Sequence, residues 1–187
     1  MGKIYDHIDE RLEAFIRAQP VFFVATAPLD GDGHLNLSPK GFNRPAVLDD
    51  HTFAYLDLTG SGVETIAHLR ENGRIVVMFC AFDGPPRIVR LHGRGEAVEK
   101  GAPGYADLAR NFPDHLSARA VIRVSVERIS DSCGYGVPLM SYQRERSQMD
   151  DWAERKGPEG IAEYQASRNA ASVDGLPGLA PVSPGKG

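Results

Sequence analysis

The stretch from Phe53 to Phe79 constrains the fold of this chain more than any other part of it. It begins with an apolar, β-prone run at 53–58 and ends with a second run at 75–79 that is apolar throughout. Gly60 and Gly62 follow the first run, and glycine lets the backbone bend sharply. The stretch therefore predicts two strands separated by a tight turn and a short connecting segment.

The connecting segment carries the start and stop signals of a helix. Ser61 precedes Glu64 by the spacing of a capping box, and Asn72-Gly73 is a typical helix end. We therefore expect a helix that begins just after Ser61. In one interpretation, the glycine turn and the free N–H groups of the helix start bind a phosphate. In the other interpretation, a plain capped helix joins two strands. The stretch alone does not decide between these two interpretations.

The composition bounds the function. The chain has 187 residues, of which 42% are hydrophobic and 25% charged, as in a soluble globular protein of one domain. A formal net charge of −4 offers no basic footprint for nucleic acid. No apolar run approaches the roughly 20 residues that span a bilayer. Two cysteines suit a reducing cytoplasm, and six histidines show no metal-ligand spacing. We expect a cytoplasmic protein without a metal site, a nucleic-acid partner or a membrane partner.

The rest of the chain adds more strands than helices. Residues 4–18 have the apolar stripe of an amphipathic helix. Four further strands are indicated at 21–26, 34–38, 87–98 and 120–129. Pro39 should end the second of these strands, and residues 40–50 should form a loop. Such a series, joined by hairpins, favours an antiparallel barrel over a parallel sheet.

The composition changes after about residue 140. Residues 142–156 are polar and helix-prone, whereas residues 172–187 are rich in glycine and proline. We therefore divide the chain into a barrel domain at 1–140, a helical C-terminal extension at 141–171 and a flexible tail at 172–187.

Three segments, at 36–41, 55–69 and 87–96, resemble in order and spacing those of the pyridoxamine-5′-phosphate-oxidase-like flavoproteins, the FMN-binding split barrels. The resemblance implies a mainly β fold, a six-stranded antiparallel split β-barrel. It also implies an FMN-dependent oxidoreductase that acts on a small molecule, and a homodimer with the cofactor at its interface.

The resemblance also implies which residues contact the cofactor. The strand that ends near Lys40 would run along the flavin, and the glycine turn would hold its phosphate. Lys40 would supply a cation; as a residue type alone, it is equally a solvated turn lysine. The implied cofactor-binding residues are Ser38, Pro39, Lys40, Gly41, Leu58, Thr59, Gly60, Ser61, Gly62, Thr65 and Arg90. No catalytic residue is assigned, because the flavin supplies the redox chemistry.

The chain departs from the family pattern in two places. Many members carry an Arg-Lys pair inside the phosphate helix, and here Glu64 and Thr65 occupy those positions. Charge neutralisation would then fall to Lys40, Arg90 or Arg87. The C-terminal tryptophan and arginine-histidine signature of true pyridoxamine phosphate oxidases is also missing, so we do not predict vitamin B6 oxidation.

Several alternatives remain open from the sequence. The same barrel could hold a deazaflavin or a haem, and haem would need an axial histidine or cysteine in the pocket. A non-catalytic flavin-binding module is another alternative, and a small barrel without any cofactor is the last.

Overall fold

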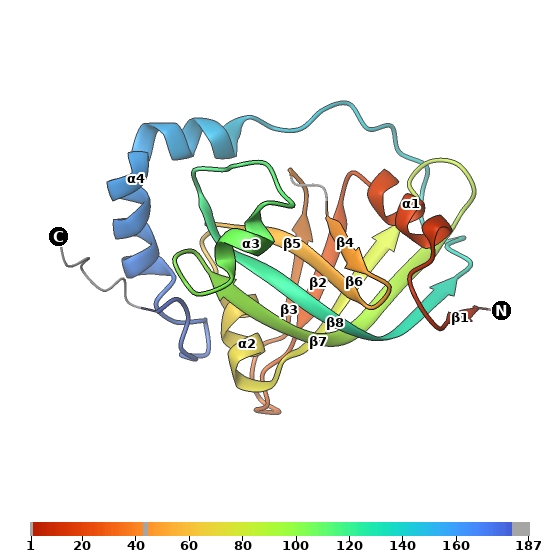
Figure 1. Cartoon of the computed structure of the whole chain (residues 1–187), viewed down its shortest axis with the longest axis horizontal. Coiled ribbons are helices and arrows are strands. Elements are labelled where there is room, and N and C mark those ends of the chain that lie inside the picture. Colours follow the sequence, from red (N-terminus) through yellow and green to blue (C-terminus); the bar gives the residue numbers. More distant parts are fainter. Residues whose placement is uncertain (1, 43–44, 181–187) are drawn as a thin grey trace.

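The structure, a computed structural model, describes residues 2–42 and 45–180 (Figure 1). Within these residues the chain forms one eight-stranded sheet and four helices. The strands are β1 (Ile4–Tyr5), β2 (Phe22–Thr26), β3 (Asn36–Lys40), β4 (Ala46–Asp49), β5 (Thr52–Leu58), β6 (Arg74–Cys80), β7 (Ile88–Glu99) and β8 (Ala118–Ser132). The helices are α1 (Glu10–Ala18), α2 (Glu64–Asn72), α3 (Tyr105–Ala109) and α4 (Gln148–Arg168).

The sheet runs in the order β3-β2-β6-β7-β8-β5-β4, with β1 added beside β8. Every one of these pairs is antiparallel. The prediction of a mainly β antiparallel fold with few helices is thus confirmed. The strand count is higher than the expected six, because β1 and β4 also join the sheet. β4 lies where we expected a loop, and its short, mixed sequence gave no clear alternation.

The hydrophobic core lies on the inner face of the sheet and is centred on aromatic rings. Phe22 packs against Phe53, Tyr55 and Phe79, with ring centroids 5.4–5.9 Å apart. Helices α1 and α2 cover this core at different ends of the sheet (Figure 1). The alternation expected on β7 is present, since Val89 and Leu91 are fully buried and their neighbours are not.

Three local predictions are wrong. The helix expected over 4–18 begins only at Glu10, since Ile4 and Tyr5 form β1. Pro39 does not end its strand, because it pairs with Phe23 inside β3; β3 is an edge strand, where proline is tolerated. Helix α2 begins at Glu64, after the N-cap Val63, and no side chain caps it. The capping box of Ser61 and Glu64 therefore does not form.

The C-terminal part folds back onto the sheet domain. Helix α4 is kinked at Gly157, which has a φ of 64°. Beyond the helix, Gly178 O accepts a hydrogen bond from Arg70, and Ala180 N donates to Glu99 Oε2 at 3.0 Å. Residues 172–180 are therefore tied to the domain, whereas their composition led us to expect a loose tail. The rest of that predicted tail, 181–187, lies outside the described residues.

None of the helices in the described part of the chain is both long and apolar enough to cross a bilayer.

Candidate functional site

A cavity of about 300 Å³ opens between β3 and the end of β5, beside the start of α2. Alternation along β3 turns Asn36, Ser38 and Lys40 to this cavity. The opposite wall is built by Leu58, the glycine turn at 60–62, Glu64, Thr65 and Arg119. The sequence segments 36–40 and 58–65, which are separate in the chain, thus meet at one cavity.

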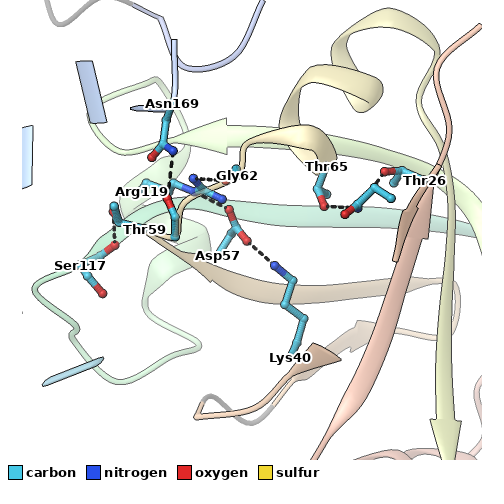
Figure 2. Close-up of polar contacts among 11 residues, drawn as sticks. Thr26, Lys40, Asp57, Thr59, Gly62, Thr65, Ser117, Arg119 and Asn169 are labelled. Atoms are coloured by element: carbon cyan, nitrogen blue, oxygen red, sulfur yellow. Dashed lines mark hydrogen bonds and ion pairs between the residues drawn. The ribbon is translucent and has the colours of Figure 1, made fainter. Parts of the chain in front are cut away.

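A buried carboxylate joins two cations at the floor of this site (Figure 2). Asp57 is fully buried, and its Oδ1 lies 2.9 Å from Lys40 Nζ. Its Oδ2 accepts a hydrogen bond from Arg119 Nε at 2.7 Å. Burial alone would raise the pKa of Asp57, but Lys40 and Arg119 outweigh it and lower the pKa below its ordinary value. The three groups carry a net charge of +1 beside the glycine turn.

Arg119 also fixes the glycine turn. Its side chain is 5% exposed, and its Nη1 donates a hydrogen bond to Gly62 O at 2.9 Å. The peptide N–H groups of the first turn of α2 have no intrahelical acceptor, and the N-cap Val63 supplies none from its side chain. A helix start with a partial positive charge and free N–H groups, next to two cations, is suited to an anion such as a phosphate.

Hydrogen-bond donors and acceptors extend this site along β3. Asn36 Nδ2 donates to Thr65 Oγ1 at 3.0 Å and to Thr26 Oγ1 at 3.1 Å. Thr26 Oγ1 in turn shares a hydrogen bond of 2.9 Å with Nδ1 of the buried His68. Ser38 Oγ is buried and has no hydrogen-bond partner within the described structure. An unpaired buried hydroxyl on the cavity wall fits a polar ligand better than an empty space.

Glu64 lies on the wall of this site, with its carboxylate close to Gly62. Its Oε1 accepts a hydrogen bond of 3.3 Å from the backbone N–H of Val173. A carboxylate at the start of a helix is favoured by the helix dipole, but it opposes a bound anion. The C-terminal segment thus holds the one acidic side chain of the cavity wall.

The cavity brings together most of the predicted cofactor-binding residues. Seven of them line it: Ser38, Lys40, Leu58, Gly60, Ser61, Gly62 and Thr65. Thr59 does not, because its buried Oγ1 donates to Ser117 O at 2.8 Å and accepts from Gln165 Nε2 at 2.7 Å. Pro39 points to the other face of β3, and Gly41 follows the end of that strand.

The predicted arginines lie elsewhere in this chain. Arg90, near the start of β7, donates to Ser132 Oγ at 3.1 Å and does not line the cavity. Arg87 contacts Tyr5 and Asp131. The cation that accompanies Lys40 is Arg119, which our sequence reasoning missed. Asp57 and Arg119 each interrupt an apolar strand run, and opposite charges in two buried runs were the signal that could have found them.

A second cavity, of about 370 Å³, lies between β8 and α3. It is lined mainly by apolar residues such as Leu56 and Tyr105, together with Lys100, Asp114 and His115. It has neither the buried ion pair nor the glycine turn. Although it is larger, it is therefore less suited to an anionic ligand than the cavity beside α2.

The described residues contain no group of three or more histidine, cysteine, aspartate or glutamate side chains that could hold a metal ion. The wall of the cavity beside α2 includes neither histidine nor cysteine. Cys80 is buried and Cys133 is exposed, and both are free thiols.

Comparisons with known proteins agree with this architecture. The model of the pyridoxamine 5′-phosphate oxidase family matches residues 8–133. The pyridoxamine 5′-phosphate oxidase family protein ustO of Aspergillus flavus is 41% identical over 196 residues, which covers 96% of this chain and 78% of that protein. A crystal structure of HupZ from Group A Streptococcus is 30% identical, with a TM-score of 0.50, and the match covers 65% of this chain and 91% of HupZ. A variant of HupZ gives 29% identity and a TM-score of 0.52 over 67% of this chain and 99% of its own.

The chain therefore belongs to the pyridoxamine 5′-phosphate oxidase family, and its sheet is the split barrel of that family. The resemblance predicted from the sequence is confirmed.

Proposed function

We propose that this chain binds FMN in the cavity beside α2 and is an FMN-dependent oxidoreductase acting on a small molecule. The observation that carries the proposal is the convergence of Lys40 and Arg119 on one buried carboxylate, next to the uncapped start of α2. Membership of the family supports a flavin as the occupant. The phosphate would then lie against the glycine turn at 60–62.

The charges of the site favour a monoester phosphate. Asp57 balances one of its two cations and leaves one positive charge beside the ligand, which the carboxylate of Glu64 on the cavity wall partly offsets. Charge-assisted hydrogen bonds from such cations are about twice as strong as neutral ones. The free N–H groups at the helix start add donors that no side chain uses. Riboflavin, which lacks the phosphate, would gain none of these interactions.

The remaining wall suits the uncharged part of the ligand. Ser38 Oγ is an unpaired hydroxyl that can donate to or accept from the ribityl hydroxyls. Leu58 offers an apolar contact beside it. When bound, the flavin supplies the hydride and electron chemistry, and the protein binds and orients it.

We also propose that the protein is a cytoplasmic homodimer with FMN at the interface. The cavity of about 300 Å³ opens to the surface at the edge strand β3. Two exposed leucines of this region, Leu35 and Leu37, are 81% and 67% exposed. A second copy over this edge would cover both the leucines and the flavin ring.

The test is a set of binding titrations on protein stripped of any ligand. FMN, riboflavin, FAD, a deazaflavin and haemin are each titrated, and binding is followed by absorbance and calorimetry. The account predicts that FMN binds at least about tenfold more tightly than riboflavin. Equal affinities for FMN and riboflavin, or tighter binding of haemin or the deazaflavin, would contradict it. Oxidation of NADH or NADPH with a quinone acceptor then separates an enzyme from a non-catalytic flavin-binding module.

A further inference from the structure

Two amide side chains at the end of the C-terminal helix contact the glycine turn and the residue that precedes it. Asn169 is fully buried, and its Nδ2 donates a hydrogen bond to Gly60 O at 3.0 Å. Gln165 Nε2 donates to Thr59 Oγ1 at 2.7 Å. These two residues lie one helical turn apart at the end of α4, so they present their amides on the same side.

Asn169 is itself held firmly in place. Its backbone N–H donates to Gln165 O, and its backbone O accepts from Leu179 N, both at 2.8 Å. The bond from Gly178 N to Ala170 O, also 2.8 Å, closes the same turn. These backbone hydrogen bonds fix the position from which the side chain of Asn169 reaches Gly60.

The contact to Gly60 O determines where the next amide points. In a planar trans peptide the carbonyl oxygen and the following N–H point in opposite directions. The N–H of Ser61 is therefore directed away from Asn169, and Figure 2 shows Asn169 and Lys40 on opposite sides of the turn. Arg119 holds Gly62 O in the same manner, so the N–H of Val63 is directed away from Arg119, and the N–H groups left for a ligand are those of Ser61 and of the first turn of α2.

Packing does not hold the turn at Gly60, although at Gly62 the carboxylate of Glu64 lies close to the backbone. A Cβ added to Gly60 would meet no atom within 4 Å, so open space surrounds the residue. Glycine also has the widest choice of backbone conformations. The hydrogen bonds from Asn169 and Arg119 are therefore what selects one conformation of the turn.

We propose that Asn169 and Gln165 are positioning residues that hold the glycine turn in the conformation that presents its N–H groups to the ligand phosphate. This inference rests on the proposed FMN site. The C-terminal segment is then part of the cofactor site, although it lies outside the residues 8–133 that match the family model. Its contact between Val173 N and Glu64 contributes by holding that carboxylate.

The test uses the full chain with Asn169→Ala and Gln165→Ala, and with Gln148→Ala as the matched control. Gln148 is exposed on the first turn of the same helix. Dissociation constants for FMN and for riboflavin are measured for each variant, together with the melting temperature without ligand. Asn169→Ala should weaken FMN binding about tenfold and riboflavin binding less than about twofold. Gln165→Ala should do so by a smaller factor, and Gln148→Ala should change neither constant.

The ratio of the two dissociation constants separates positioning from a structural role. A variant that only loosens the fold weakens FMN and riboflavin binding together and leaves their ratio unchanged, which would overturn the inference. If Asn169→Ala does not fold, Gln165→Ala decides by the same ratio, since Gln165 is only partly buried. If the wild-type chain already shows no preference for FMN, the proposed function itself fails. A wild-type preference that both variants retain overturns the inference alone.

Discussion

The two ends of α2 are built in different ways. At its C-terminal end, Gly73 adopts a φ of 70° and its N–H donates to Leu69 O, while Arg94 and Gly95 of β7 donate to the carbonyls of Asn72 and Gly73, so the protein itself pairs the groups at this end. At its N-terminal end no side chain caps the helix. There the glycine turn is instead held by Arg119 and Asn169, which are distant in sequence. The comparison indicates that the first end is only structural, whereas the second is kept open for a ligand.

The largest expected effect lies at the open end and concerns Asp57. Asp57→Ala leaves Lys40 and Arg119 without their shared partner, in a site where Arg119 is buried. We expect the free energy of unfolding to fall by about 3–5 kcal/mol, as measured by urea denaturation. A loss below about 1 kcal/mol would show that the two cations do not depend on this carboxylate.

The same carboxylate should give a pH dependence. The pKa of Asp57 is lowered in the folded protein, so its stabilising contribution is present above the pKa of the unfolded chain. That contribution is lost as the pH falls through the lower, folded pKa, which places the loss below about pH 4. Denaturation midpoints measured from neutral to acid pH should therefore fall more for the wild type than for Asp57→Asn. Parallel curves for the two proteins would contradict this assignment.

Next in size is the loss of ligand affinity when Lys40 is removed. In Lys40→Ala, Asp57 keeps Arg119, so the fold should remain. We expect FMN binding to weaken by about 10- to 100-fold, since hydrogen bonds to charged groups contribute about 1.5–3 kcal/mol. The control is Lys100→Ala, because Lys100 lines the other cavity. If Lys100→Ala weakens FMN binding and Lys40→Ala does not, the ligand occupies the cavity at α3 instead.

A change at the C-terminal end of α2 should lower the stability of the fold and leave FMN binding unchanged. Gly73→Ala forces a residue with a Cβ into the left-handed region, at a cost of about 1–2 kcal/mol in the free energy of unfolding. The dissociation constant for FMN should stay within about twofold of the wild type, because the contribution to stability does not involve the ligand. If Gly73→Ala lowers FMN affinity without lowering stability, the C-terminal end of α2 is not only structural, which contradicts the comparison.

The smallest effect is expected at Glu64. Glu64→Lys removes the negative charge of the cavity wall and its contact with Val173 N. FMN affinity should stay the same or increase a few-fold, since a charge at a helix start contributes only about 0.3–1 kcal/mol. A clear loss of affinity, in the same titration, would show that the carboxylate has a further role in binding.

The features that could be predicted from the sequence are those that neighbouring residues determine. Gly73 marks the end of α2, and the alternation around Val89 and Leu91 marks the buried face of β7. The start of α2 was placed incorrectly because a capping box is a local pattern, whereas here Arg119 and Asn169, which are distant in sequence, hold the turn before the helix and the helix start stays uncapped. Asp57 and Arg119 were missed for the same reason. Their meaning depends on the pairing of β5 with β8, which brings two charged residues together from isolated positions.

The conformation of the C-terminal segment also could not be predicted from local sequence. The glycine and proline content of residues 172–187 indicated a loose tail, yet Gly178 and Ala180 are fixed by hydrogen bonds to Arg70 of α2 and Glu99 of β7. Composition reports on the intrinsic preference of a segment, whereas a few well-placed hydrogen bonds decide its conformation.

The most direct test of this account is a crystal structure of the protein grown with FMN. We predict electron density for the phosphate against the glycine turn at 60–62, within hydrogen-bonding distance of Lys40 or Arg119 and of the first amides of α2. Density for the flavin at any other place, with the turn contacted only by the protein's own side chains, would contradict the account.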